Sequence, residues 1–328
     1  MNNTRDIRVV VAIDFGTTFS GFAYSNKINP ETITNDTVIC YFNNNNNKFI
    51  VARTNRSFQN QYNDDKPPLP PGLDPRKAIT DYLHEMNKLV SETLNSRWPG
   101  IRYPQQVRFV LSVPSEWHHD AKAIMRECMF NAGYLDNRQS ENLEFTTEPE
   151  AAAVYCMKSL TEHHLSAGSS FMIVDCGGAS TERRCSAMFL VGGFSESQYL
   201  QQQIRRQFMN QVPIIAVPKH PIAAIERGAL EYGLNMEIVQ TRVLKFCYGV
   251  EVSAKWEKGD PPERRTPSGR IFKFHRLALR GVEVAVDQKF YYTAGPVVPN
   301  QTDMTFNIFI TPDNNAKYCD EDVKPRLK

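Results

Sequence analysis

The stretch Val11-Ala12-Ile13-Asp14-Phe15-Gly16-Thr17-Thr18-Phe19-Ser20-Gly21 decides how this chain is interpreted. An apolar run leads into a carboxylate, a glycine and two threonines, the order expected where a buried strand ends in a tight turn. The N–H and hydroxyl groups of such a turn can bind a phosphate. Taken alone, the pattern also fits an ordinary hairpin turn. Its weight therefore depends on the segments that follow it.

Size and composition narrow the class of protein. The chain has 328 residues, 41% of them hydrophobic, which predicts two or three domains, or one large and one small. A net charge of +2 indicates no nucleic-acid partner. The seven cysteines lack the close spacing of a zinc or redox motif. The N-terminus is polar, and no apolar run approaches the roughly 18 residues of a membrane span. We expect free thiols, no membrane partner and a cytoplasmic location.

Strands alternate with helices up to about residue 232, which predicts a layered α/β domain. Strands are predicted at 8–13, 21–25, 37–41, 48–52, 107–113, 143–146, 170–174, 187–191 and 213–217. Helices are predicted at 74–98, from 115 to about 131, and at 150–160, 196–208 and 221–232. From residue 243 the pattern changes to short strands at 250–254, 270–274, 282–286, 288–293 and 304–311, typical of a β-rich module.

A second glycine turn follows a buried strand. In residues 173–180, Asp175 ends an apolar run and is followed by Gly177 and Gly178. Two phosphate-binding turns that face each other, each headed by an aspartate, would form a nucleotide clamp. Asp14 and Asp175 would then hold Mg²⁺ through water and orient an attacking water molecule. The competing interpretation is that Asp14 only caps the end of its strand.

Two more segments complete the pattern. In residues 189–197 another apolar run is followed by Gly192 and Gly193. Between the two aspartate turns, Glu148 precedes a helix that starts at a proline, and we interpret it as a further group that positions water. Glu148 could instead only stabilise the helix dipole. Gly192 and Gly193 could be only a tight turn.

These five segments resemble the nucleotide-site motifs of the actin, sugar kinase and heat-shock-chaperone ATPase superfamily. VAIDFGTTFSGFAY looks like the first phosphate loop, EPEAAAVYC the first connecting segment, VDCGGAS the second phosphate loop, MFLVGGFSESQYL the adenosine loop and HPIAAIERGALEYGL the second connecting segment. The segment VRFVLSVPSEWHHDAKAIMRECMFNAGY is similar to the heat-shock protein 70 (DnaK-type) family. Within that family, the chain looks most like the divergent members of the "12" subgroup, which is expanded in some fungi. The resemblance covers most of residues 7–312.

The resemblance implies an α/β, actin-like ATPase (ribonuclease H-like) two-lobe fold with the second lobe truncated, followed by a partial β-rich module. The implied domains are residues 1–185, the first lobe and the start of the second phosphate loop; 186–241, the remnant of the second lobe; and 242–328, a partial substrate-binding-like module. The implied cofactors are ATP or ADP and Mg²⁺. The implied partners are unfolded or peptide clients and co-chaperones.

The family's site residues carry over by position. Asp14, Glu148 and Asp175 would be the catalytic groups, with Asp14 and Asp175 also holding Mg²⁺ through water. The residues that the resemblance assigns to the nucleotide itself are Gly16, Thr17 and Thr18 for the β and γ phosphates, Gly177 and Gly178 for phosphate, and Gly192 and Gly193 for adenosine.

The chain departs from the family pattern at several positions. Only residues 181–188 separate the second phosphate loop from the strand of the adenosine loop, where relatives carry a whole subdomain. Ala179 replaces a glycine, Glu196 stands where the chaperones commonly have a base-stacking arginine, and Ile222 where they have an aspartate. The lysine that the chaperones use near the γ phosphate has no counterpart in a matching motif, and Lys48 and Lys66 are candidates by default.

We therefore predict an ATP-binding protein related to heat-shock protein 70, with an incomplete nucleotide cleft and impaired ATP hydrolysis. Phosphoryl transfer depends on positioning and preorganised electrostatics. The absence of the subdomain that forms part of the cleft in relatives should therefore reduce turnover more than it weakens phosphate contact. One alternative is a non-enzymatic interaction protein that keeps the fold without the nucleotide. A second is a small-molecule kinase of the same superfamily.

Overall fold

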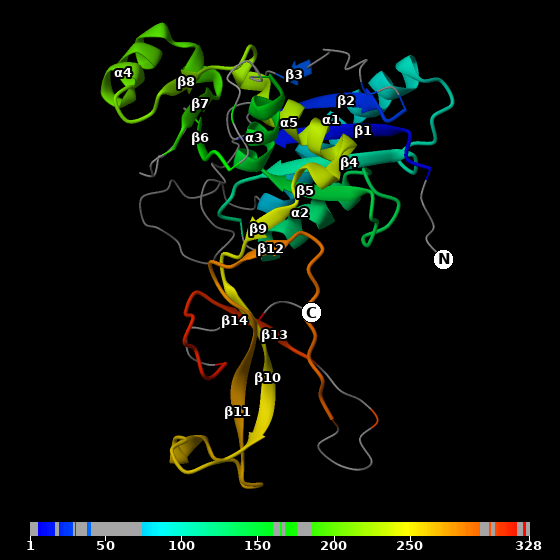
Figure 1. Cartoon of the computed structure of the whole chain (residues 1–328). Coiled ribbons are helices and arrows are strands. Elements are labelled where there is room, and N and C mark those ends of the chain that lie inside the picture. The colour runs from blue at the N-terminus through cyan, green and yellow to red at the C-terminus, as the bar shows by residue number, and fades with distance from the viewer. Residues whose placement is uncertain are drawn as a thin grey trace. The chain divides into compact units, whose positions relative to one another are not determined.

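The chain forms two compact units, Met1–Ile238 and Val239–Lys328, which are described separately (Figure 1). The computed structural model describes residues 6–16, 20–28, 30, 38–40, 74–117, 119–159, 165, 168–175, 185–295, 302, 306–319 and 324–325. The division at 238/239 lies slightly before the predicted boundary at 241/242. The predicted boundary at 185/186 stays a prediction.

The first unit is built on a mixed five-stranded sheet in the order β3-β2-β1-β4-β5. Its strands are β1 (Val9–Phe15), β2 (Ser20–Asn26), β3 (Val38–Cys40), β4 (Val107–Val113) and β5 (Leu143–Thr147). β1 pairs antiparallel with β2 and parallel with β4, and β4 pairs parallel with β5. The carboxyl ends of β1, β4 and β5 therefore lie at one edge of the sheet. This is the ribonuclease H-like strand order that the resemblance implies.

The two faces of β1 are buried by different helices. Val9, Val11 and Ile13 contribute to a core with helices α1 (Pro75–Arg97) and α2 (His119–Asn131). On the opposite face, Val10 lies against α5 (Ala224–Leu234). A strand buried on both faces is apolar at successive positions, which explains the continuous run Val9–Ile13.

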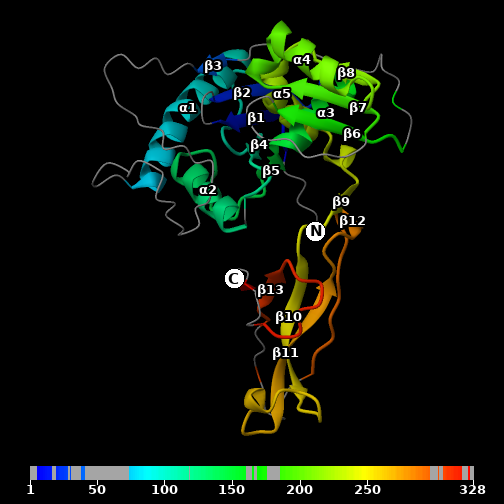
Figure 2. The same ribbon diagram turned by 90° about the vertical axis from the view of Figure 1, so that its left-hand side faces the viewer.

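A second, parallel sheet of three strands follows in the order β6-β7-β8. Its strands are β6 (Phe171–Asp175), β7 (Ala187–Val191) and β8 (Ile214–Ala216). Helices α3 (Glu148–Ser159) and α5 pack on one face, and α4 (Gln198–Phe208) packs on the other. Figures 1 and 2 show α3 and α5 between the two sheets. The first unit is thus a stack of alternating helical and sheet layers, the α/β fold of the actin-like ATPases.

Glycines fix how closely the central helices approach their neighbours. A Cβ atom at Gly228 of α5 would lie 1.7 Å from the main-chain oxygen of Ala151 in α3. A Cβ at Gly233 would lie 2.5 Å from Val110 Cγ2 and 2.6 Å from Val10 Cγ1. The guanidinium group of Arg108 in β4 also donates to the Gly233 carbonyl at 3.1 Å. The register of α5 on the first sheet is therefore tightly determined.

The second unit is β-rich. Its larger sheet has the order β11-β10-β13-β14 and a two-stranded sheet pairs β12 with β9. The strands are β9 (Thr241–Val243), β10 (Cys247–Lys255), β11 (Arg270–Ala278), β12 (Glu283–Ala285), β13 (Ile308–Thr311) and β14 (Lys324–Pro325). β10 and β11 form a long antiparallel ribbon in which Lys255 faces Arg270 and Tyr248 faces Ala278.

The structure confirms most of the predicted helices and strands and corrects others. The strand predicted at 48–52 lies outside the described residues. Residues 288–293 were predicted to be a strand, and this is wrong, because they have no regular secondary structure and pair with no strand in the described part of the chain. β9 was missed, since three residues are too few to show alternation. Within the described ranges, every helix is too short or too polar to span a bilayer.

Candidate functional site

Asp14 lies at the carboxyl end of β1, where the sequence placed it. Its Oδ1 accepts a hydrogen bond of 2.6 Å from Ser112 Oγ, which lies opposite it on β4. Burial raises the pKa of Asp14 to about 6, and the nearby charge of Asp175 also raises it, while the Ser112 hydrogen bond opposes the shift. A carboxyl group held near sheet-edge loops in this way is available to bind a cation or a water molecule.

Glu148 begins α3 directly after β5, at the same edge of the sheet. The Glu150 carboxylate accepts from the Thr147 N–H and the Thr147 hydroxyl accepts from the Glu150 N–H, both at 3.3 Å. This reciprocal pair is a capping box, so Glu150 caps the helix end and Glu148 is not needed for that purpose. Burial raises the pKa of Glu148 to about 7, with further contributions from Asp14 and Asp175.

Asp175 ends β6 in the second sheet, and its side chain is exposed. It influences both Asp14 and Glu148 electrostatically, in each case raising the pKa. The structure therefore brings together the three carboxyl groups that were proposed as catalytic. They come from three different strand ends on two sheets. Ligand sites of α/β proteins occur at the carboxyl ends of strands in the same way.

A fourth carboxyl group, Glu226, was not foreseen. It lies in the first turn of α5 and only 3% of its surface is exposed. Burial and, to a smaller extent, the charge of Asp14 raise its pKa to about 8, so Glu226 interacts electrostatically with this cluster. The signal available in the sequence was weak: Glu226 follows Ala223-Ala224-Ile225, but Arg227 comes directly after it, before Gly228-Ala229-Leu230.

The predicted nucleotide-binding loops are described only in part. Gly16 directly follows β1, and its carbonyl accepts from the Ser20 hydroxyl at 3.4 Å. Thr17, Thr18, Gly177 and Gly178 lie outside the described residues. Their assignment to the phosphates stays a prediction.

The predicted adenosine loop follows β7. Gly192 has a φ of 84°, a left-handed conformation that favours glycine, and its N–H donates to the Pro221 carbonyl at 2.9 Å. Gly193 packs against Ile222, since a Cβ there would lie 3.5 Å from Ile222 Cδ1. The loop is thereby attached to the short helix η3 (Pro221–Ala223), which leads into α5 and Glu226.

The acidic cluster fits the Mg²⁺ ion that the family implies. Carboxylate oxygens are its preferred protein ligands, and Mg²⁺ usually retains several water molecules. Among the described residues, no three side chains of the His, Cys, Asp and Glu types lie close enough together to ligate a metal directly. Asp14 and Asp175 are carboxyl groups of the kind that would hold such an ion through water.

Comparison with known proteins gives partial matches. No protein-family model matches the chain. Heat shock 70 kDa protein 12B of Homo sapiens is 40% identical over 67 residues, which are 20% of this chain and 10% of that protein. Heat shock 70 kDa protein 12A of Homo sapiens is 29% identical over 136 residues, 40% of this chain and 20% of that protein. A non-polymerising mutant of MamK bound to AMPPNP aligns over 70% of this chain and 99% of its own, with 11% identity and a TM-score of 0.35.

The layered α/β fold, with acidic side chains gathered at its strand ends, is that of the actin-like ATPases. Segments of the chain are similar in sequence to the heat shock 70 kDa proteins 12B and 12A. The matches span only 10% and 20% of the length of those two relatives.

Proposed function

We propose that the chain binds ATP or ADP together with Mg²⁺ and hydrolyses ATP weakly. The observation that carries this proposal is the meeting of Asp14, Glu148 and Asp175 at three strand ends. The sequence predicts a phosphate-binding turn directly after Asp14 and another directly after Asp175. In this role Asp14 and Asp175 hold the hydrated ion, and Glu148 orients a water molecule. Burial is the main cause of the raised pKa values of Asp14 and Glu148, and the charges of neighbouring carboxylates add to it. Binding to Mg²⁺ would offset this repulsion.

Weak hydrolysis is supported by the short connection between β6 and β7. These strands are direct parallel neighbours, and only residues 176–186 join them. A parallel connection needs about a dozen residues merely to cross over, so no subdomain fits into this one. A nucleotide cleft without the subdomain that relatives carry at this point excludes water poorly. Water in the cleft weakens each electrostatic contact in the transition state.

Removing the Asp175 carboxylate should weaken nucleotide binding without unfolding the chain. The side chain is exposed, and one charge-assisted contact is worth about 1.5–3 kcal/mol. Asp175→Asn should therefore raise the Kd for Mg-ATP about tenfold or more in isothermal titration. Asp136→Asn, at an exposed position on the same unit, is the matched control and should bind like the parent chain. If the parent chain, Asp175→Asn and Asp136→Asn all bind Mg-ATP with equal affinity, Asp175 is not part of the site.

ATP hydrolysis should be slow even when the chain is saturated with Mg-ATP. In a phosphate-release assay with saturating Mg-ATP, we expect a rate well below the range of typical enzymes, about 1–10³ s⁻¹. Glu148→Gln should lower any remaining rate and leave the Kd nearly unchanged, because Glu148 is proposed to act on water rather than on the nucleotide. A rate within the ordinary enzymatic range would contradict the proposal of impaired hydrolysis.

A second candidate function, peptide binding, is favoured by one feature of the second unit. This unit contains a cavity of about 320 Å³ with mainly apolar walls, large enough to take an apolar side chain. A client peptide is the partner that the relationship to the chaperones suggests. This activity would persist in a protein that does not hydrolyse ATP. It would also be the main activity if the chain proves to be a non-enzymatic interaction protein.

A further inference from the structure

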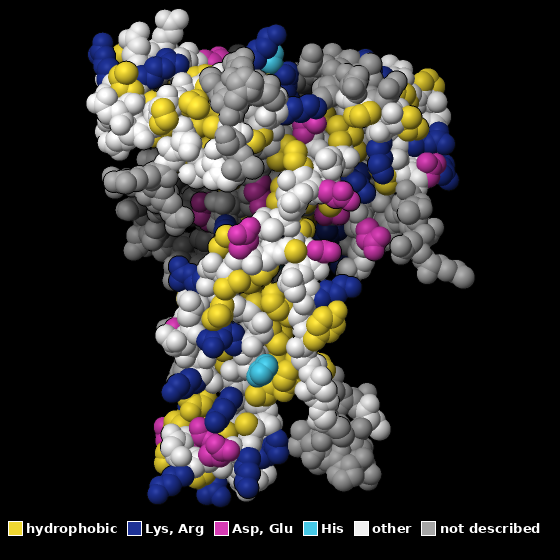
Figure 3. Space-filling view, viewed as in Figure 1, with side chains coloured by type: hydrophobic (Ala, Val, Ile, Leu, Met, Phe, Trp, Pro, Cys, Tyr) yellow, Lys and Arg dark blue, Asp and Glu magenta, His cyan; other side chains and the backbone are white. Residues whose placement is uncertain are grey.

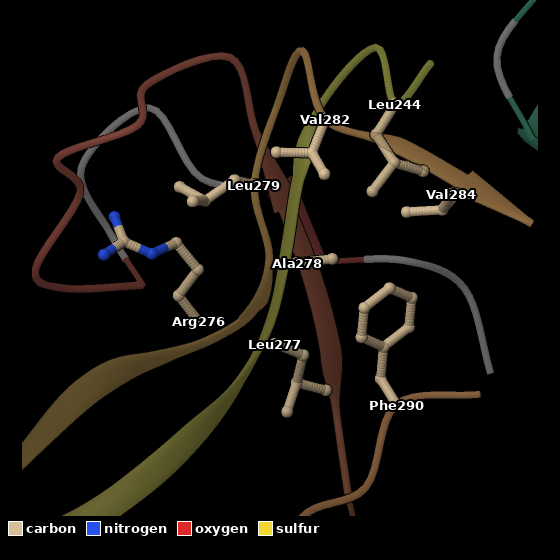
Figure 4. A pocket seen from close by; sticks show the side chains of 8 residues that line it. All are labelled: Leu244, Arg276, Leu277, Ala278, Leu279, Val282, Val284 and Phe290. Atoms are coloured by element: carbon tan, nitrogen blue, oxygen red, sulfur yellow. The ribbon is translucent and has the colours of Figure 1, made fainter. Parts of the chain in front are cut away.

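The two ends of the β10–β11 ribbon differ in chemistry. One end, at Ala278, lines the pocket whose side chains Figure 4 shows. At the other end β10 finishes at Lys255 and β11 begins at Arg270, and residues 256–269 join the two strands (Figure 1). This joining segment, which we call the ribbon tip, includes the short helix η5 (Pro262–Arg264). Neither nucleotide binding nor the pocket involves it.

The ribbon tip and the strand ends beside it are positively charged. Residues 255–273 contain six lysine or arginine residues and three acidic residues, so their net charge is +3. Lys255 and Arg270 lie opposite each other in the pairing of the two strands. Figure 3 shows Lys and Arg side chains gathered at this end of the second unit. Such a segment attracts anionic groups and enzymes with acidic binding surfaces.

The three acidic side chains of this region are accounted for. Asp260 pairs with Lys273 at 2.8 Å, and its second carboxylate oxygen accepts from the Glu257 N–H at 3.0 Å. Glu257 and Glu263 are exposed, and in the part of the chain that the structure describes neither forms an ion pair with Arg265. The charge of Arg265 is therefore not cancelled by an acid of the tip.

Ser268 presents its hydroxyl group in the turn that leads into β11. Gly269 closes this turn by donating its N–H to the Thr266 carbonyl at 2.9 Å, and it has a φ of 73°, which favours glycine. The Thr266 hydroxyl is half-buried and accepts from the Arg270 N–H at 3.0 Å. Ser268 is exposed, and its Oγ lies 3.0 Å from Thr266 Oγ1. Ser268 is therefore the hydroxyl group of this turn that an enzyme can reach.

Arg265, three residues before Ser268, is held beside the same turn. Its guanidinium carbon lies 5.1 Å from the centroid of the Trp256 ring, and the ring is fixed because its Nε1–H donates to the Pro261 carbonyl at 3.2 Å. Arg265 Nη2 lies 3.9 Å from the point that a Cβ atom on Gly269 would occupy. Stacking uses the face of a guanidinium and leaves the N–H groups at its edge for an anion. Among the described residues, no carboxylate lies within ion-pair distance of this guanidinium.

We propose that Ser268 is a phosphorylation site for a protein kinase that recognises arginine near the acceptor serine. In the transfer, Ser268 Oγ attacks the γ phosphorus of the ATP bound to the kinase. A bond forms between Oγ and this phosphorus, the bond from the phosphorus to the oxygen of the leaving ADP breaks, and the hydroxyl proton passes to the catalytic aspartate of the kinase. The exposed turn supplies the acceptor, and Arg265 supplies the positive charge that the kinase recognises.

Arg265 also stabilises the product. The phosphate adds a charge of about −1.5 to −2, which lowers the net charge of residues 255–273 from +3 to about +1. A phosphoserine next to an arginine gains charge-assisted hydrogen bonds, and these favour the doubly charged form of the phosphate. The modification therefore converts a cationic tip into a turn held by an internal pair of phosphate and arginine.

Phosphorylation of the full chain in vitro tests the site. The chain is incubated with ATP in separate reactions with cyclic-AMP-dependent kinase and calmodulin-dependent kinase, which both select arginine near the acceptor, and with casein kinase, which selects acidic residues. We expect the arginine-directed kinases to phosphorylate Ser268, as located by mass spectrometry of peptide fragments, and casein kinase to leave it unmodified. The chain incubated with ATP alone is the blank.

Variants separate the acceptor from the recognition charge. Ser268→Ala should lose this phosphate, whereas Ser96→Ala, at an exposed serine of α1 without an arginine three residues before it, should keep it. Arg265→Gln should lower kcat/KM of the kinase about tenfold or more, since a charge-assisted contact is lost. Lys258→Gln removes the same charge at another exposed position of the tip and should change kcat/KM less than about twofold.

The pair between phosphate and Arg265 has a readout of its own. In ³¹P NMR titrations the second pKa of a phosphoserine is ordinarily about 6. It should be about 0.5 lower in the phosphorylated parent chain than in phosphorylated Arg265→Gln, because the arginine favours the doubly charged phosphate.

Each part of the proposal has a result that contradicts it. If neither arginine-directed kinase modifies Ser268, or if the same phosphate content remains in Ser268→Ala, the site is wrong. If Arg265→Gln and Lys258→Gln are phosphorylated as fast as the parent chain, Arg265 is not the recognition charge. If the phosphoserine has the same pKa in the parent chain and in Arg265→Gln, the internal pair does not form.

Discussion

Replacing Gly228 by alanine is expected to destabilise the first unit by about 3 kcal/mol or more, or to prevent its folding. The new Cβ would lie 1.7 Å from the main-chain oxygen of Ala151, and the main chain cannot move aside as a flexible side chain can. Alanine gains about 1 kcal/mol over glycine in a helix, whereas overpacking costs about 1–3 kcal/mol and occasionally more. The steric term should win, because α3 and α5 would have to separate.

Two other glycine substitutions calibrate this result. Gly233→Ala overlaps the side-chain methyl groups of Val10 and Val110, which can adjust, so its effect should be smaller, about 1–3 kcal/mol. Gly295→Ala meets no atom within 4 Å and should change the free energy of unfolding by less than about 0.5 kcal/mol. Chemical denaturation of the three variants should give this order. A Gly228→Ala protein as stable as Gly295→Ala would contradict the close packing of α3 on α5.

Glu226→Gln should make the protein more stable at alkaline pH and leave it nearly unchanged at acid pH. Because burial raises the pKa of Glu226 to about 8, the native state holds a proton that the unfolded state has released at pH values between about 4.5 and 8. The free energy of unfolding therefore falls as pH rises through this window, by up to about 1.4 kcal/mol per pH unit. Glutamine stays neutral and escapes this loss.

The expected gain above pH 8 is at most about 5 kcal/mol, or roughly 10–20 °C in Tm for a unit of this size. Thermal unfolding at pH 5 and pH 8.5 measures it, with Glu237→Gln as an exposed control on the same unit. Asp14 and Glu148 have pKa values raised to about 6 and 7. In both variants they should also make the free energy of unfolding fall as pH rises, but by less than Glu226 does. An equal gain at both pH values would place Glu226 outside the acidic cluster.

Much of the first unit could be predicted because local signals and tertiary structure agree there. The almost wholly apolar run of β4, Val107–Val113, indicates a strand buried on both faces, and the structure has it with the same limits. The helix opened by Asp74-Pro75 is equally clear, and the Asp74 carboxylate accepts from the Arg76 N–H at 3.0 Å. In both cases a few adjacent residues suffice to determine the element.

The parts that were missed depend on residues distant in the sequence. Glu226 becomes part of the cluster only because Gly228 and Gly233 let α5 approach α3 and β1 closely, and nothing local indicates that approach. Residues 288–293 have the composition of a strand, but pairing requires a neighbouring strand that local composition does not reveal. The meeting of Asp14 with Asp175 likewise required two sheets to be placed together.

The central claim is that the first unit binds a nucleotide with Mg²⁺ at the carboxyl groups of Asp14, Glu148 and Asp175. Thermal unfolding of the full chain during titration with Mg-ATP and Mg-ADP tests it most directly, because a ligand that binds the native state must stabilise it. At a hundredfold excess over Kd the stabilisation should be about 2.7 kcal/mol, a rise of roughly 5–10 °C in Tm. Asp175→Asn should require about tenfold more nucleotide for the same rise. A Tm that does not move at millimolar nucleotide would contradict the claim.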